Sequence, residues 1–324
     1  DAQRRYRELL VRSAANENAR RAAAAFRVEH KQVYLEDLRG IDRCTTCHLG
    51  VENPSMAAAT APLTRHPGDI LAIHPVERFG CTACHDGQGR AVAKEEAHGW
   101  TAAGRAVPDA ESPMLRGRAV YTSCGRCHDE VDLFGSHQDL YVSAEGEGSG
   151  AKQPIDAFSI ALSLPGAVEA AAGKRILAGS GCLGCHKYRG RGGILGPDIT
   201  FLGDKKRHGF DFSHVKGEHT VEQWLYEHFM VPGEVSPGTT MPDMGFKPEE
   251  ARRLSLYMLS LHKKTAPASH RPPPAIARSR TPEPVRGETL YGMFCSACHG
   301  AEGFGSTLRT GLWPLDADPW GRQW

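Results

Sequence analysis

The stretch Cys44-Thr45-Thr46-Cys47-His48 is the first of five copies of one pattern, in which two cysteines separated by two residues are followed at once by a histidine. The other copies run from Cys81 through Cys84 to His85, from Cys124 through Cys127 to His128, from Cys182 through Cys185 to His186, and from Cys295 through Cys298 to His299. The chain has ten cysteines, and all ten belong to this pattern. One chemical explanation must therefore use both thiols and the adjacent imidazole in every copy.

Cys-x-x-Cys-His is the attachment signature of c-type haem. The two thiols add across the haem vinyl groups, and the histidine is placed beside the iron as its proximal ligand. A zinc site would combine cysteine pairs with one another and has no use for the fixed histidine. A disulfide framework gives no reason for a constant spacing. The pattern therefore predicts five covalently bound haem c groups, held by the ten cysteines, with the five motif histidines as iron ligands.

The overall composition excludes two classes of protein. The 324 residues contain 39 Lys and Arg against 38 Asp and Glu, so the formal charge is +1. A nucleic-acid-binding protein is expected to carry a clear basic excess, which is absent here. The sequence has no run of eighteen apolar residues that could span a bilayer. Because the chain starts at Asp1 without a Met or a signal-peptide pattern, we expect it to be processed or partial.

The motif spacing predicts a mainly α fold with extensive coil, in which a multihaem cytochrome module precedes single-haem α domains. Segments of about 40 residues cannot build their own core, so the first three motifs should share one module. The expected parts are an N-terminal helix (1–40), a trihaem module (41–140), a linker (141–165), a monohaem domain (166–264), a Pro-rich linker (265–285) and the start of a second, incomplete monohaem domain (286–324). Within the 166–264 domain, helices are expected near 167–180, 220–230 and 248–263. The Arg-rich first helix either packs on the haem module or continues a missing membrane anchor.

Residues 166–264 resemble class I cytochrome c. The matching features are Gly173, the motif from Cys182 to His186, Gly196-Pro197-Asp198, Thr240-Met241-Pro242 and Leu256-Tyr257-Met258-Leu259. The resemblance implies that the Pro197 carbonyl accepts a hydrogen bond from His186, that Met241 is the sixth ligand of the fourth iron, and that Tyr257 packs near Gly173. Met244 is the alternative ligand. His208, His214, His219 and His228 are expected to be surface or loop residues.

Residues 41–140 are similar to multihaem cytochrome subunits of bc-type and alternative complex III assemblies, which oxidise quinols. The resemblance lies in the stretches 42–50, 79–85 and 87–90. It implies redox protein partners that are subunits of a membrane complex, and a periplasmic or extracytoplasmic location.

The first three irons need sixth ligands, and no Met in a Met-Pro context is near them. His66 and His74 each precede a proline between the first two motifs, and His98 precedes Gly99. Rigid loops can present such imidazoles to a neighbouring iron, so we predict these three histidines as distal ligands. His137 and His30 are reserves. The sequence leaves open which histidine serves which iron.

The fifth motif presents a separate problem, because only 25 residues follow His299 and they contain neither Met nor His. Either the natural chain continues past Trp324, or a ligand comes from elsewhere in the chain. His262 and His270 are the internal candidates.

An iron with both axial positions filled by protein has no site for substrate and passes electrons. We therefore expect an electron carrier, not an enzyme, that links a membrane quinol-oxidising complex to downstream acceptors. Two alternatives are a subunit of an extracellular conductive filament and a multihaem redox enzyme that uses an open fifth haem.

Overall fold

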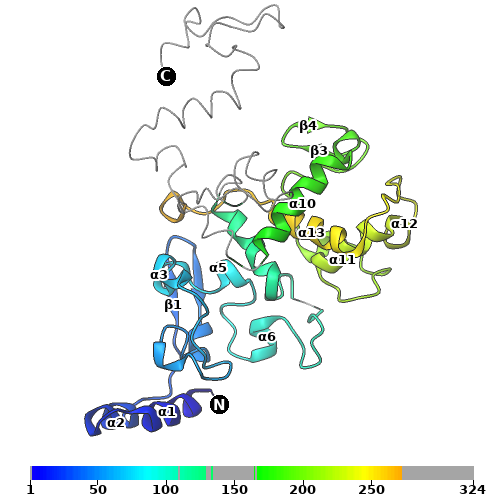
Figure 1. Cartoon of the computed structure of the whole chain (residues 1–324). Helices are drawn as coiled ribbons and strands as arrows, with labels where there is room; N and C mark the ends of the chain where they lie inside the picture. Colours follow the sequence, from blue (N-terminus) through cyan, green and yellow to red (C-terminus); the bar gives the residue numbers. More distant parts are fainter. Residues whose placement is uncertain (1, 109, 129–132, 134–163, 165, 272–324) are drawn as a thin grey trace, which may run out of the picture. The chain divides into compact units, whose positions relative to one another are not determined.

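The computed structural model describes residues 2–108, 110–128, 133, 164 and 166–271, which lie in one unit that extends from Asp1 to Pro272 (Figure 1). The fifth motif, most of the predicted 141–165 linker and the region after 271 lie outside the described residues.

Short helices and turns dominate the described chain. In the first half they are α1 (Ala2–Ser13), α2 (Glu17–Ala24), β1 (Val33–Leu35), β2 (Gly40–Asp42), the 3₁₀ turns η1 (Cys44–Thr46) and η2 (Pro54–Met56), α3 (Ile70–Ile73), α4 (Val76–Phe79), α5 (Thr82–His85), α6 (Lys94–His98) and η3 (Gly117–Arg126). In the second half they are α10 (Ala167–Gly179), η4 (Cys182–Gly184), β3 (Lys187–Tyr188), β4 (Arg191–Gly192), η5 (Leu202–Asp204), η6 (Arg207–Gly209), α11 (Val221–Met230), α12 (Pro232–Val235), α13 (Pro248–Leu259) and η7 (Ala268–His270). The predicted fold class, mainly α with extensive coil, is confirmed.

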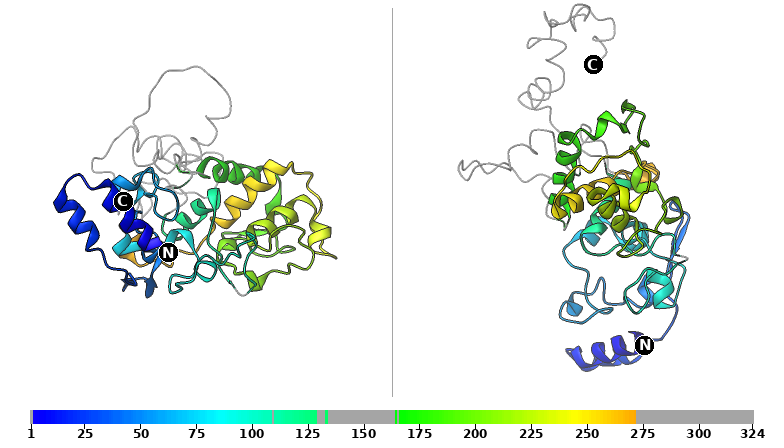
Figure 2. Two further views of the ribbon diagram at one scale, coloured as in Figure 1. Left: turned by 90° about the horizontal axis from the view of Figure 1, so that it is seen from below. Right: turned by 90° about the vertical axis from the view of Figure 1, so that its right-hand side faces the viewer.

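The single N-terminal helix predicted over 1–40 is wrong. The side chain of Asn16 accepts a hydrogen bond from the Ala19 amide at 2.8 Å and caps a second helix, so the chain turns back after α1. The two helices lie side by side as a hairpin (Figure 2). After α2 the chain is extended, and β1 pairs antiparallel with β2. Ala and Arg favour helix along the whole stretch, but a local cap and the strand pairing override that preference.

The second half contains the three helices that the sequence predicted. α10 and α13 cross where Gly173 faces the backbone carbonyl of Arg253 and the Cβ of Tyr257, and a Cβ on Gly173 would collide with both. This close approach requires glycine, as the resemblance to class I cytochrome c implied. At the start of α13 the Glu250 side chain accepts a hydrogen bond from the Lys247 amide at 2.8 Å, next to Pro248 in the first turn.

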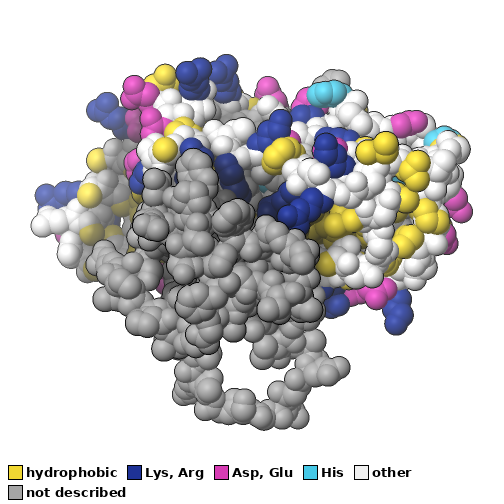
Figure 3. Space-filling model, turned by 90° about the horizontal axis from the view of Figure 1, so that it is seen from above, with side chains coloured by type: hydrophobic (Ala, Val, Ile, Leu, Met, Phe, Trp, Pro, Cys, Tyr) yellow, Lys and Arg dark blue, Asp and Glu magenta, His cyan; other side chains and the backbone are white. Residues whose placement is uncertain are grey.

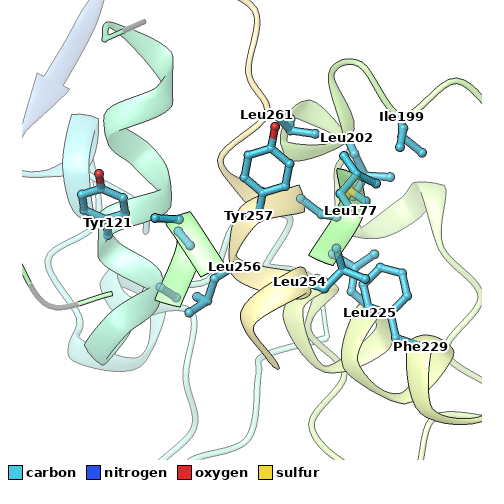
Figure 4. Close-up of a cluster of buried hydrophobic side chains, with 14 of the residues drawn as sticks. Tyr121, Leu177, Ile199, Leu202, Leu225, Phe229, Leu254, Leu256, Tyr257 and Leu261 are labelled. Carbon is cyan, nitrogen blue, oxygen red and sulfur yellow. The ribbon is translucent and has the colours of Figure 1, made fainter. Parts of the chain in front are cut away.

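The main hydrophobic core lies between α10, α11 and α13 (Figure 4). Leu177, Leu225, Leu254 and Tyr257 are among its buried side chains. Cys124 and Cys182, from the third and fourth motifs, pack against this cluster from its edges, as does Met241. The same core therefore supports two haem motifs and the predicted methionine ligand.

The three-motif region is joined to the α10–α13 region by several polar contacts. Arg207 donates to the carbonyls of Val107 at 2.7 Å and Ala110 at 2.8 Å. Gly125 lies so close to the Ser260 carbonyl that a Cβ would overlap it. The region of the third motif thus packs directly on the end of α13.

On the face drawn in Figure 3, acidic and basic side chains are interspersed around the apolar ones. Among the described residues, none of the helices has both the length and the apolar character needed to cross a bilayer.

Candidate haem sites

The four described motifs adopt the same tight turn. In each of them the histidine amide donates to the carbonyl of the first cysteine at 2.9 Å: His48 to Cys44, His85 to Cys81, His128 to Cys124 and His186 to Cys182. This turn holds the two thiols and the imidazole of each motif in one local arrangement. The eight described cysteines form no disulfide with one another.

Each motif histidine of the first three motifs faces one other histidine ring. The ring centres are separated by 6.0 Å for His48 and His98, 6.2 Å for His85 and His66, and 6.1 Å for His128 and His74. His66, His74 and His98 are the three histidines that the sequence singled out as distal ligands. The structure brings each of them to a different motif, and in an order that differs from their order along the chain.

The separation of these rings fits an iron between them. Metal–imidazole bonds are about 2 Å long, so two imidazoles on opposite sides of one ion have their ring centres roughly 6 Å apart. All three pairs have this spacing. A cavity of about 420 Å³ is lined by His48, Thr45 and Leu49, so the first site also provides space beside its proximal imidazole.

Hydrogen bonds orient several of these imidazoles. His66 Nδ1 lies 2.8 Å from the Pro67 carbonyl, and His74 Nδ1 lies 3.3 Å from the Ile70 carbonyl. His48 bonds to the carbonyl of Pro62. A ring whose Nδ1–H donates to a carbonyl keeps the lone pair of Nε2 available for a metal.

Burial also favours the neutral form that an iron ligand needs. It is the main cause that lowers the pKa of His48, His85, His74 and His98 below the usual value. For His48 the next cause is His98, and for His85 it is His66. The described arrangement therefore holds these rings uncharged and opposite one another.

The first three motifs are in contact in chain order. The thiols of Cys44 and Cys81 are within hydrogen-bonding reach, which joins the first motif to the second. Burial raises the pKa of Cys84 to about 11 and that of Cys124 to about 12, and the next largest cause for each thiol is a cysteine of the other's motif. Arg126 donates to the Ala83 carbonyl at 3.0 Å and forms an ion pair with Asp86 at 2.8 Å.

In the fourth motif, the Pro197 carbonyl lies 2.9 Å from His186 Nδ1, as the resemblance to class I cytochrome c implied. Gly196 packs flat against the same ring, because a Cβ there would lie 2.5 Å from its Cε1. Both contacts leave Nε2 of His186 free to face an iron. The fourth site thus fits a covalently bound haem on its proximal side.

The candidates for the opposite side of the fourth site differ in burial. Met241 is partly buried against the main core, whereas Met244 is exposed. His228, expected on the surface or in a loop, instead lies on α11 and stacks on Trp224 with ring centres 4.5 Å apart. Burial, followed by the neighbouring His186, lowers the pKa of His228 to about 4. His228 is therefore a half-buried neighbour of the fourth site, less exposed than the sequence predicted.

The remaining candidates are placed as follows. His30 is exposed, and His137 and the whole fifth motif lie outside the described residues. His262 Nδ1 lies 2.8 Å from Asp204 Oδ1, and its Nε2 is buried without a hydrogen-bond partner among the described residues. His270 uses both ring nitrogens, toward Ser269 Oγ at 3.1 Å and the Arg78 carbonyl at 2.9 Å. Of the two internal candidates for the fifth iron, His270 is thus already engaged.

Sequence reasoning missed Asp42, a buried carboxylate that receives hydrogen bonds from the first and second motifs. It precedes Cys44 by two residues, and an Asp in that position signals at most a local turn cap. Its bonds to the second motif depend on a contact between segments 40 residues apart, which no local pattern reveals.

Comparison with known proteins is informative for one part of the chain. The cytochrome c family profile matches residues 170–262, which include the fourth motif, α10, α11 and α13. No curated protein and no solved structure gave a significant match. Residues 170–262 therefore form a cytochrome c domain, and the chain is an electron-transfer protein that binds haem c covalently.

Proposed function

We propose that this chain is a five-haem c-type cytochrome that transfers electrons between a membrane quinol-oxidising complex and downstream acceptors in the periplasm. The observation that carries the proposal is the set of three opposed histidine pairs, with ring centres 6.0 to 6.2 Å apart. Together with the fourth and fifth motifs, they account for every Cys-x-x-Cys-His in the chain.

Bound haem supplies a one-electron couple whose potential depends on the axial ligands, burial and hydrogen bonds. The protein's part is to fill the axial positions and hold the ligands still. In the first three sites, His98, His66 and His74 would bind the side of the iron opposite the motif histidine, which would leave no open position for a substrate. This arrangement supports an electron carrier and not an enzyme.

The contacts between motifs support an ordered route. The first motif meets the second through Cys44 and Cys81, and the second meets the third through Arg126 and Asp86. The third motif meets the cytochrome c domain through Gly125 and Ser260. Lys264 reinforces this last contact by donating to the Gly125 carbonyl at 2.7 Å and to the His128 carbonyl.

The ligand types give the route a direction. A methionine ligand raises the potential of a haem relative to a second histidine. We therefore propose that electrons enter at the three bis-histidine sites and move to the site of His186 and Met241, then toward the fifth motif. Partly buried Met241, next to the main core, supports this assignment over exposed Met244.

Intact mass and a spectroscopic redox titration of the full chain test the proposal. We expect a mass that exceeds the polypeptide by five haem groups, and a low-potential class well separated from a higher-potential histidine–methionine class. Fewer than five haem masses in a matured sample would contradict the haem count. A histidine–methionine site with the lowest potential would contradict the direction of transfer.

The proposed partner is tested by adding the protein to membranes that oxidise quinol. We expect reduction of the low-potential class before the histidine–methionine class, and loss of reduction when the quinol-oxidising complex is inhibited. Reduction that is unaffected by such an inhibitor would contradict the proposed donor. Polymers seen by negative stain would instead favour the filament alternative.

A further inference from the structure

Asp42 is a buried charged residue that the haem-ligand assignment does not use. It is the last residue of β2, and only 1% of its surface is exposed. Gly80 makes room for it, because a Cβ at Gly80 would lie 3.0 Å from Asp42 Oδ2 and closer still to Leu35. Gly80 has a φ of 64°, a conformation that glycine adopts without strain. The two segments are thus shaped to enclose this carboxylate.

The Asp42 carboxylate is a hydrogen-bond acceptor for both the first and the second motif. Oδ1 accepts from the Cys44 amide at 3.0 Å. Oδ2 accepts from the amides of Cys81 at 2.7 Å and Thr82 at 3.0 Å, and from Thr82 Oγ1 at 3.3 Å. Burial alone would raise the pKa of Asp42, but hydrogen bonds from the Thr82 amide, from the Cys44 side chain and amide, and from the Cys81 amide outweigh it, so the pKa lies below its usual value. A carboxyl group that only accepts is therefore held in its charged form.

This negative charge has no ion-pair partner within the part of the chain that the structure describes. The neighbouring Arg43 is directed elsewhere, toward the Gln32 amide oxygen at 3.2 Å and the Arg90 carbonyl at 2.7 Å. Amide dipoles compensate the charge locally, but they do not cancel it as a cation would. Its field therefore reaches the groups around it.

The groups around it are the attachment points of two haems. One carboxylate oxygen of Asp42 and the sulfur atoms of Cys44 and Cys81 all lie within 4.8 Å of one another. Cys44 belongs to the first motif and Cys81 to the second. A single buried charge thus lies at the point where the two motifs meet.

We propose that Asp42 is a shared electrostatic control that lowers the reduction potentials of the first and second haems together. This inference rests on the proposed function, in which both sulfurs are bound to haem. The oxidised iron carries one more positive charge than the reduced iron, so a buried anion stabilises the oxidised form. Asp42 is therefore a positioning residue whose charge also keeps the entry end of the route at low potential.

Asp42→Asn in the full chain, with five haems verified by intact mass, tests this inference. We expect two components of the low-potential class to shift upward together in a spectroscopic redox titration, while the third low-potential component and the histidine–methionine site stay in place. Asp198→Asn is the matched control, since exposed Asp198 lies beside the fourth motif and accepts only local bonds from Thr200. We expect it to leave the low-potential class unchanged.

Thr82→Val provides a second variant with the opposite expected sign. It removes the hydroxyl donor to Oδ2 and keeps the amide, so the carboxylate is less compensated and both potentials should shift downward. A purely structural Asp42 predicts no such opposed pair of shifts. Unchanged potentials in Asp42→Asn with five haems bound, or a shift of one component or of all equally, would overturn the inference. If Asp42→Asn binds fewer than five haems, Thr82→Val decides instead, and the absence of its downward shift would overturn the inference about Asp42. A wild-type chain that binds fewer than five haems would contradict the proposed function.

Discussion

His74 faces His128 with ring centres 6.1 Å apart, although His74 lies between the first and second motifs and His128 belongs to the third. The neighbouring His66 faces the second motif, and His98, which lies after the second motif, faces the first. The three motifs are therefore interlocked, because the segment between the first and second motifs places histidines beside the second and third, and the segment between the second and third places one beside the first. Removal of one segment is expected to disturb more than one site.

Met241→Ala tests the sixth ligand of the fourth site. We expect loss of the sulfur-to-iron charge-transfer band and a lower potential for one haem, because a weaker or absent ligand replaces the thioether. Met244→Ala and His228→Ala are the matched variants, measured by the same absorption and redox titrations. If Met244→Ala abolishes the band while Met241→Ala keeps it, the ligand is Met244 and not Met241. If only His228→Ala changes the absorption and potential of this site, the ligand is His228.

Gly173→Ala tests the close crossing of α10 and α13. A Cβ at this position would collide with the Arg253 carbonyl, so we expect a loss of about 1–3 kcal/mol in the free energy of unfolding, typical of overpacking. Gly179→Ala is the control on the same helix, because a Cβ there meets nothing within 4 Å. We expect it to be neutral or to stabilise by up to about 1 kcal/mol. Equal effects of the two variants in urea unfolding would count against the crossing.

Arg126→Ala tests the junction of the second and third motifs. The side chains of Arg126 and Asp86 are 26% and 18% exposed, and Arg126 also donates to the Ala83 carbonyl. Loss of this partly buried pair should lower the free energy of unfolding by about 2 kcal/mol, between the values for exposed and fully buried ion pairs. Arg20→Ala breaks an exposed pair with Glu17 and should change it by less than about 1 kcal/mol. A comparable loss of unfolding free energy in both variants would contradict the proposed stabilising role of Arg126 between the second and third motifs.

Asp204→Asn tests a pH-dependent contact at the end of α13. Burial alone would raise the pKa of Asp204, but hydrogen bonds from His262 and the Lys263 amide outweigh it and lower the pKa. A depressed carboxyl pKa contributes stability above the unfolded pKa of about 3.9, and that contribution is lost as the pH falls through the folded value. We therefore expect the variant to unfold at lower urea concentration at neutral pH, and the difference from wild type to close below about pH 4. A difference that stays constant across this window would contradict the assignment.

Local patterns predicted much of this architecture. α10, α11 and α13 begin and end close to the predicted bounds because capping residues, Pro248 and apolar spacing act within one or two helical turns. The N-terminal helix was mispredicted because its composition is uniform, while one Asn16 side chain and a three-residue strand decide the outcome.

The candidate haem sites, too, could be predicted from the sequence only in part. The histidines that face the motifs could be chosen from the sequence, since Pro67 and Pro75 stiffen two of their loops. Their assignment to individual motifs, and the bonds of Asp42 to Cys81, depend on which distant segments meet in space. No periodicity or spacing encodes that information, and iron binding by these histidines stays a prediction.

The central claim is that three bis-histidine irons lie in the first three motifs, with His98, His66 and His74 as distal ligands. Low-temperature electron paramagnetic resonance of the full chain, compared with the variants His98→Ala, His66→Ala and His74→Ala, tests it most directly. Each variant should keep all five haem masses and convert one low-spin bis-histidine signal to a high-spin signal that added imidazole reverses, while the exposed control His30→Ala changes nothing. Low-spin signals that persist unchanged in any of the three variants would contradict the account.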